Sequence, residues 1–232
     1  MGGIMKIEDL QKQLVSKSCV KQDVFGITKE VFGQLNEVVE EITKDLEIHV
    51  TPCDSRVELN FKSSGEYESR MTLTGDAVIF HMHTNVFSFP PSHRIFKSPY
   101  VQKDDLNAYC GVINIYNFLA DSFRFHRLND SGYLIGRIFV NRDKHFFVEG
   151  QNQLGFLFND FSTLELNKEK LRQVVLTALN YIINFDLYTP PYPQVNQVKL
   201  HEIQELSHNL KLQTGKRLGF QFEADQKPMS DF

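Results

Sequence analysis

The chain has 232 residues, with 25 basic and 29 acidic side chains and a formal net charge of −4. This balance lacks the strong basic field of nonspecific nucleic-acid binders, so we do not expect a nucleic-acid partner. The three cysteines form no CxxC pair and no zinc spacing, and no apolar run is long enough to span a bilayer. We therefore expect one cytoplasmic domain spanning residues 1–232, with no membrane association and no identifiable cofactor motif.

The N-terminal part of the chain predicts two helices, over residues 6–17 and 28–47, with Thr28 as the N-cap of the second. In both segments apolar residues recur at the spacing of one helix face. These faces carry Ile7, Leu10 and Leu14 in the first helix and Val31, Leu35, Val38, Val39, Ile42 and Leu46 in the second. We expect this helical pair, over 6–47, to precede an α+β core over residues 56–212.

Three strands are predicted next, over residues 57–62, 67–74 and 77–87. The first alternates apolar and polar residues, as a strand with one solvated face does, and Gly75-Asp76 is a hairpin signal between the other two. Residues 88–104 contain three prolines and no periodicity. A loop of this length in a compact domain is usually functional or mobile.

The segment 105–124 carries two conflicting signals. Leu106, Tyr109, Ile113, Tyr116, Ala120 and Phe123 follow helical spacing. The β-branched residues Val112, Ile113 and Ile115 favour a strand instead. We predict a helix, because the periodic stretch is longer than an ordinary strand.

Three more strands are predicted between Gly132 and Asp160, where apolar residues occupy both faces of the pattern. A polar four-residue turn, Asn141 to Lys144, closes the first hairpin, and the third strand covers 154–158. This register places residue 137 opposite 148, so Arg137 and Glu149 are predicted to be diagonal neighbours within reach of an ion pair.

A strong helix is predicted to follow Asn167, its expected N-cap, and a last helix is predicted over residues 198–212. Residues 223–232 are expected to be disordered. The predicted fold class is α+β, with a mostly antiparallel sheet of about six strands in two three-strand meanders. Each meander is followed by a helix, two helices precede them and one ends the chain, in a two-layer sandwich.

The pair His81 and His83 is the most specific local pattern for a metal. Residues two apart on a strand face the same way, so both imidazoles could bind one ion. The pair lacks the HExxH or zinc-ribbon context that would make this interpretation specific. A solvated strand face that carries two histidines is the simpler alternative.

Two further groups are candidates for binding a ligand. His93, Arg94 and Lys97 lie together in the proline-rich loop and could receive an anion, although basic loop residues are commonly just solvated. The second group is Asn114, Tyr116, Arg137 and Glu149. Within it the Arg–Glu pair is either structural or a site that holds a carboxylate.

The chain contains no GxSxG elbow and no phosphate-binding P-loop. We therefore expect a non-catalytic domain that binds a small molecule or a protein. A metal-dependent hydrolase that uses His81 and His83 is one alternative. A structural subunit of a homo-oligomer, such as a homodimer, is another.

Overall fold

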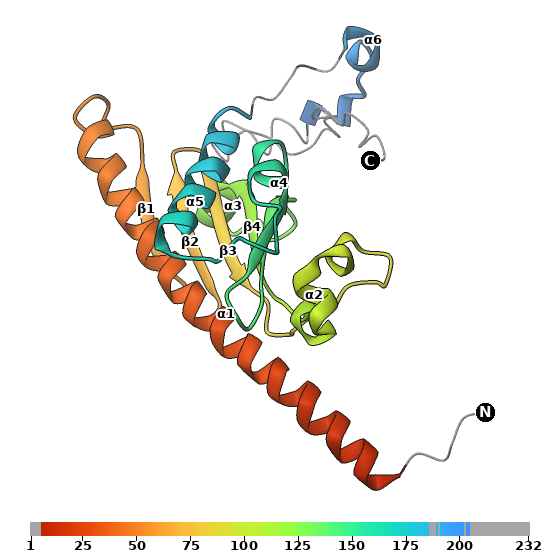
Figure 1. The fold of residues 1–232 in the computed structure, drawn as a ribbon. Coiled ribbons are helices and arrows are strands. Elements are labelled where there is room, and N and C mark those ends of the chain that lie inside the picture. The colour runs from red at the N-terminus through yellow and green to blue at the C-terminus, as the bar shows by residue number, and fades with distance from the viewer. Residues whose placement is uncertain (1–5, 186–188, 190, 202, 205–232) are drawn as a thin grey trace.

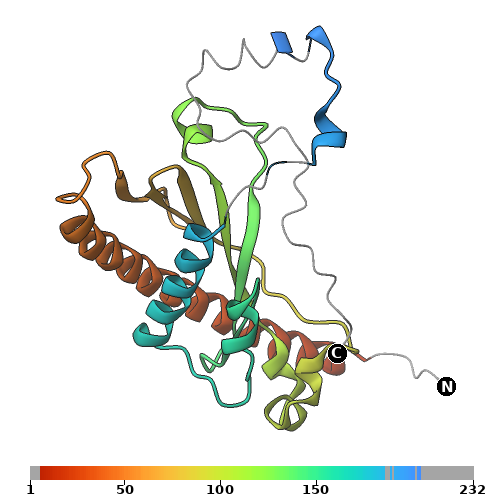
Figure 2. The ribbon, with the colours of Figure 1, turned by 90° about the horizontal axis from the view of Figure 1, so that it is seen from above.

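The computed structural model describes residues 6–185, 189, 191–201 and 203–204, and their fold is α+β. Six strands form one open antiparallel sheet in which each strand pairs with the next along the chain (Figures 1 and 2). They are β1 (Leu59–Ser63), β2 (Glu68–Leu73), β3 (Asp76–Met82), β4 (Gly111–Leu119), β5 (Tyr133–Val140) and β6 (Phe146–Gly150). The α+β class and the antiparallel six-strand sheet are thus as predicted.

A single helix, α1 (Ile7–Val50), replaces the predicted helical pair. The segment between the two predicted helices contains Gly26 but no proline, and Val20 and Val24 within it are buried. One internal glycine costs a helix only about 1 kcal/mol, which this burial offsets. In Figure 1 the first turns of α1 extend beyond the sheet, and residues 6–19 are all exposed.

Thr28 lies inside α1 and is not an N-cap. It is buried, and its hydroxyl donates a hydrogen bond to the Val24 carbonyl over 2.6 Å. A Cβ atom on Gly111 would lie 2.0 Å from the Thr28 Oγ1 atom. A glycine at the start of β4 therefore lets the sheet approach α1 closely.

The predicted helix over 105–124 is wrong. This segment holds a 3₁₀ turn, η2 (Asp105–Ala108), then β4 in the middle of the sheet, then a short helix, α3 (Ala120–Arg124). β4 is buried on both faces along its first half, which explains why apolar residues there are not restricted to alternate positions. The chain therefore does not form two three-strand meanders that are each followed by a helix.

The predicted strand over 154–158 is also wrong, because this segment contains a helical turn, α4 (Gln153–Leu157). Leu154 and Phe158 are buried while Phe156 is 77% exposed, which is the four-residue spacing of a helix and not strand alternation. A Cβ atom on Gly155 would lie 2.7 Å from the carbonyl oxygen of Gly150. The turn therefore packs directly against the end of β6.

Helix α5 (Lys168–Ile183) is confirmed, together with its predicted N-cap. The Asn167 side chain accepts a hydrogen bond from the Lys170 amide over 2.9 Å. A further short helix, α6 (Tyr192–Val195), follows. Most of the predicted helix over 198–212 lies outside the described residues. The predicted disordered tail over 223–232 lies entirely outside them.

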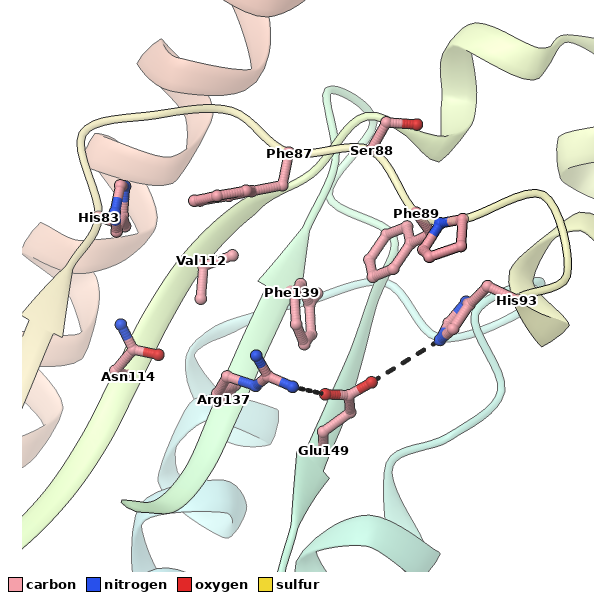
Figure 3. A pocket seen from close by; sticks show the side chains of 11 residues that line it. His83, Phe87, Ser88, Phe89, His93, Val112, Asn114, Arg137, Phe139 and Glu149 are labelled. Carbon is pink, nitrogen blue, oxygen red and sulfur yellow. Dashed lines mark hydrogen bonds and ion pairs between the residues drawn. The ribbon is translucent and has the colours of Figure 1, made fainter. Parts of the chain in front are cut away.

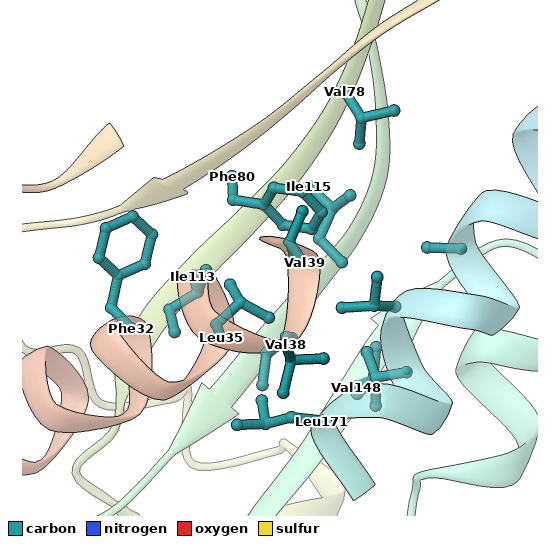
Figure 4. Close-up of a cluster of buried hydrophobic side chains, with 14 of the residues drawn as sticks. Phe32, Leu35, Val38, Val39, Val78, Phe80, Ile113, Ile115, Val148 and Leu171 are labelled. Atoms are coloured by element: carbon teal, nitrogen blue, oxygen red, sulfur yellow. The ribbon is translucent and has the colours of Figure 1, made fainter. Parts of the chain in front are cut away.

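The main core lies between the sheet and the two helices α1 and α5, which pack on the same face (Figure 4). We call this the helix face of the sheet and the opposite one the open face. The helix face is mainly apolar: Leu35 of α1 and Ile113 of β4, for example, are fully buried. Among the described residues, no helix combines the length and the apolar character needed to cross a membrane.

On the open face, the connection between β3 and β4 (residues 83–110) forms a second, smaller cluster with the sheet. β3 ends at Met82, so the strand predicted over 77–87 is shorter than expected, although Phe87 still pairs with Cys110 in an isolated bridge. The predicted long loop holds a 3₁₀ turn, η1 (Arg94–Lys97), and a short helix, α2 (Pro99–Lys103).

Candidate functional site

A pocket of about 380 Å³ lies on the open face, between the sheet and the β3–β4 connection (Figure 3). Strands β4, β5 and β6 supply its floor: Val112, Asn114, Arg137, Phe139 and Glu149. The connection supplies its walls: His83, Phe87, Ser88, Phe89, Pro90 and His93. About half of the lining residues therefore belong to regular strands, and the others belong to the proline-rich β3–β4 connection.

The polar part of the floor is a row of three side chains on adjacent strands. Asn114 of β4 pairs with Arg137 of β5, and Arg137 pairs with Glu149 of β6. Pairing residues point to the same face of a sheet, so these three groups lie side by side. The sheet register alone brings them together.

The predicted register of the β5–β6 hairpin is wrong by one residue, because Arg137 lies directly opposite Glu149. The turn contains five residues, 141–145, since Val140 pairs with Phe146. Asn141 is fully buried and holds this turn: its side-chain oxygen accepts hydrogen bonds from the amides of Asp143 and His145, each over 3.0 Å.

Arg137 and Glu149 form an ion pair that remains accessible. The Arg137 Nη2 atom donates to Glu149 Oε2 over 2.5 Å, and the two side chains are 45% and 32% exposed. The second carboxylate oxygen, Oε1, lies 3.7 Å from His93 Nε2, which is beyond hydrogen-bond distance. One face of the carboxylate is therefore left to interact with a molecule in the pocket.

His93 is oriented by its own backbone. Its Nδ1 atom accepts a hydrogen bond from the Ile95 amide over 3.3 Å, so a neutral His93 carries its proton on Nε2 and directs it toward Glu149. The ring of Phe89 stacks on that of His93, with centroids 4.5 Å apart, and meets the Phe139 ring edge-on at 5.2 Å. These rings form an aromatic wall next to the polar row.

Asn114 presents a free carboxamide to the pocket. Its residue is 8% exposed, and its side chain makes no hydrogen bond to any other residue that the structure describes. Its nitrogen and oxygen are not among the buried unpartnered polar atoms of these residues, so they reach the solvent of the pocket. A bound molecule could take the place of that solvent and offer the carboxamide a donor or an acceptor.

The β3–β4 connection is held in place by a polar network at the β5–β6 turn. Tyr100 of α2 stacks on His145, with ring centroids 4.2 Å apart, and its hydroxyl hydrogen-bonds Asp143 and Asn141. Burial and the neighbouring Asp143 carboxylate raise the pKa of the Tyr100 hydroxyl above its ordinary value. The pocket wall is thus anchored at a distance from the pocket itself.

Four of the predicted ligand-binding residues, Asn114, Arg137, Glu149 and His93, line the pocket together. The other three, Tyr116, Arg94 and Lys97, do not. Tyr116 lies farther along β4 beside Phe118, and Arg94 lies over the Phe147 ring at 5.9 Å. The aromatic lining at Phe87, Phe89 and Phe139 was not predicted from the sequence.

The two predicted metal ligands are separated in role. His83 lines the pocket and its Nδ1 atom accepts a hydrogen bond from the Asn85 amide over 2.9 Å, while His81 pairs with Glu68 and Asn114 in the sheet. Across the described part of the chain, no three His, Cys, Asp or Glu residues are grouped so that they could hold a metal ion. This finding does not support the metal-dependent hydrolase, which stays an untested prediction.

No protein-family model, no curated protein and no solved structure matches the chain.

Proposed function

We propose that the protein is a non-catalytic domain that binds a small molecule in the pocket on the open face of its sheet. The observation that carries this proposal is the Asn114 carboxamide, which lines the pocket floor and has no hydrogen-bond partner among the described residues. Its nitrogen and oxygen are not among the buried unpartnered polar atoms of these residues, so they are open to the pocket. A ligand in the pocket can therefore form hydrogen bonds with a carboxamide that offers both a donor and an acceptor.

The make-up of the pocket supports a small molecule. Its volume of about 380 Å³ falls in the range of small-molecule sites, which pair apolar and aromatic walls with a few polar groups. We favour binding over catalysis because Arg137 and Glu149 neutralise each other. Among the described residues, Ser88 is the one hydroxyl in the lining, and it has no hydrogen bond to an imidazole there.

The test combines native mass spectrometry of protein purified from its own host with saturation-transfer NMR against a fragment library. We expect a retained mass or a set of binders for the wild type. The substitution Val112→Phe would fill the pocket from its floor and should abolish binding. Val15→Phe, on an exposed turn of α1, is the matched control and should bind as the wild type does.

Circular dichroism and thermal unfolding establish that each variant is folded. If Val112→Phe does not fold, Ser88→Trp at the exposed rim replaces it, because a rim substitution leaves the core untouched. Absence of any binder to the wild type, or unchanged binding to the blocked variants, contradicts the proposal.

Self-association is a second candidate function, favoured by the first turns of α1. Ile7 and Leu14 are 61% and 63% exposed, and Leu10 between them is 49% exposed, on one face of a helix that extends beyond the sheet. Glu8 and Asp9 precede a basic stretch of Lys12, Lys17 and Lys21. Two copies paired antiparallel would place acidic turns against basic ones.

Sedimentation over a roughly hundredfold range of concentration tests this candidate by mass action. A concentration-dependent dimer that Leu10→Glu disperses would support it. A monomer at every concentration would remove it.

A further inference from the structure

We propose that the molecule bound in this pocket is a neutral, flat nitrogen heterocycle that presents hydrogen-bond donors and acceptors along one edge, as a nucleobase does. This inference rests on the proposed small-molecule site and names its ligand class. It follows from three features of the pocket: its charge, the order of its polar groups and the orientation of its rings.

The charges of the pocket cancel. Arg137 and Glu149 are joined by a 2.5 Å hydrogen bond, and each is the other's ionic partner. An anionic ligand would have to compete with the Glu149 carboxylate for Arg137, and a cationic ligand would have to compete with Arg137 for Glu149. A neutral ligand faces neither cost, because it binds without separating the pair.

The polar row offers hydrogen-bonding groups in a defined order. Glu149 Oε1 is an acceptor, Arg137 has N–H groups beyond the one that binds Glu149, and Asn114 supplies both a donor and an acceptor. Adjacent strands lie about 4.8 Å apart, so these groups form a nearly straight line along the floor. A ligand edge with neighbouring donors and acceptors can meet several of them at once.

The rings of the wall favour a flat ligand. Phe87 and Phe89 are only partly buried, and both line the pocket from the β3–β4 connection (Figure 3). Phe139 on the floor is 4% exposed, with its ring stacked on Phe147 and under the Arg137 guanidinium, so it supports the wall and does not itself offer a stacking face. Planar heterocycles stack on rings such as those of Phe87 and Phe89 whatever their identity, because every base has a π-face.

A polynucleotide is a poorer match than a free base or nucleoside. Nucleic-acid binding depends on basic side chains that neutralise phosphates, and this chain carries a net charge of −4. Of the described residues that line the pocket, one is an arginine, and Glu149 already neutralises it. The ligand class is therefore a single heterocycle, with or without an attached sugar.

The experiment is an NMR titration of the full-length ¹⁵N-labelled protein with four nucleosides: guanosine, adenosine, cytidine and uridine. Benzyl alcohol (a flat ring without the polar edge), acetate and choline are titrated in parallel. We expect at least one nucleoside to shift the amide signals of the pocket residues and to bind at least about tenfold more tightly than benzyl alcohol, acetate or choline.

Two substitutions then test the polar row. Asn114→Leu and Glu149→Gln should each weaken binding of that nucleoside about tenfold, which is the loss expected for one hydrogen bond. The matched control is Glu58→Gln, because Glu58 pairs with Arg124 on the surface, outside the pocket, over 2.7 Å. That control should bind as the wild type does.

The outcomes separate this inference from the proposed function. Preferred binding of acetate, choline or benzyl alcohol in the pocket overturns the ligand class and leaves the small-molecule site standing. A 5′-monophosphate that binds more than about tenfold better than its nucleoside overturns the neutral character of the ligand. If no probe binds and no mass is retained from the host, both the inference and the proposed function fail.

Discussion

The two faces of the sheet differ in what they contribute to the protein. On the helix face, α1 and α5 cover β-strand side chains that are almost all apolar and fully buried. On the open face the same strands carry Asn114, Arg137 and Glu149 beside aromatic rings, under an irregular connection. Adjacent residues of one strand therefore differ in surroundings: Ile113 lies in the main core, and Asn114 lies in the proposed binding pocket. Substitutions on the two faces should therefore have different effects on stability and on binding.

The largest difference is expected for the same valine-to-alanine change on each face. Val148 is fully buried in the main core, so Val148→Ala should lower the free energy of unfolding by about 2–3 kcal/mol through lost burial and a new cavity. Val112 borders an existing pocket, so Val112→Ala only enlarges a space that is already open and should cost roughly 1 kcal/mol or less. Urea unfolding of both variants measures the two values. Equal losses would mean that the open face is packed as tightly as the helix face.

Tyr100→Phe should have the next largest effect, because it removes the hydroxyl that joins α2 to the β5–β6 turn. Asn141 and Asp143 would both lose a partner, at a cost of about 1–2 kcal/mol. The folded state raises the pKa of Tyr100 above its ordinary 10.0, so the unfolded chain releases this proton first as pH rises. This contribution to wild-type stability is therefore complete below about pH 10 and lost above it.

Urea unfolding of the wild type and Tyr100→Phe between neutral pH and pH 11 checks both parts. The two curves should converge as pH rises, since the variant lacks the titrating group. Tyr133→Phe is a control for tyrosine loss on the other face, where Tyr133 packs against the main core and the Phe185 ring. Parallel curves for wild type and Tyr100→Phe would show that the hydroxyl titrates alike in the folded and unfolded states.

The connection on the open face is also harder to predict from sequence than the regular elements. Strands β1 to β3 and helix α5 follow from periodicity and capping, although α1 is one helix where the pattern predicts two. Strand β4 was mistaken for a helix because a central strand is apolar on both faces, and Tyr109, Ile113 and Tyr116 then matched helical spacing by coincidence. Asn114, Arg137, Glu149 and His93 were named from the sequence as candidates.

The contacts that bring these four candidates together are not predictable from periodicity or capping. The hairpin register depends on the buried Asn141, whose side chain accepts two backbone hydrogen bonds and extends the turn by one residue. The position of the β3–β4 connection depends on the stacking of Tyr100 on His145, a contact between residues far apart in the chain. No local pattern contains information of this kind, so the aromatic wall was missed.

Arg137→Met separates the structural and the binding interpretations of the ion pair. Both side chains are partly exposed, so we expect the free energy of unfolding to fall by about 1 kcal/mol at most. Ligand binding should fall much more, because Arg137 lies at the centre of the polar row. Arg124→Met, which removes the partner of Glu58, is the matched control and should leave binding unchanged. A stability loss above about 2 kcal/mol would favour a structural pair, as expected for a buried and uncompensated carboxylate.

The smallest effect is expected where α1 leaves the sheet. Leu35 and Leu14 continue the same apolar stripe of one helix, but Leu35 is fully buried while Leu14 is 63% exposed. Leu14→Ser should therefore change the free energy of unfolding by no more than about 0.5 kcal/mol at low protein concentration, because it removes no packing within the chain. If the first turns of α1 pair with a second copy, the cost should rise with protein concentration. Urea unfolding at two widely separated concentrations distinguishes these cases. A large cost that does not depend on concentration would instead contradict self-association through this part of α1.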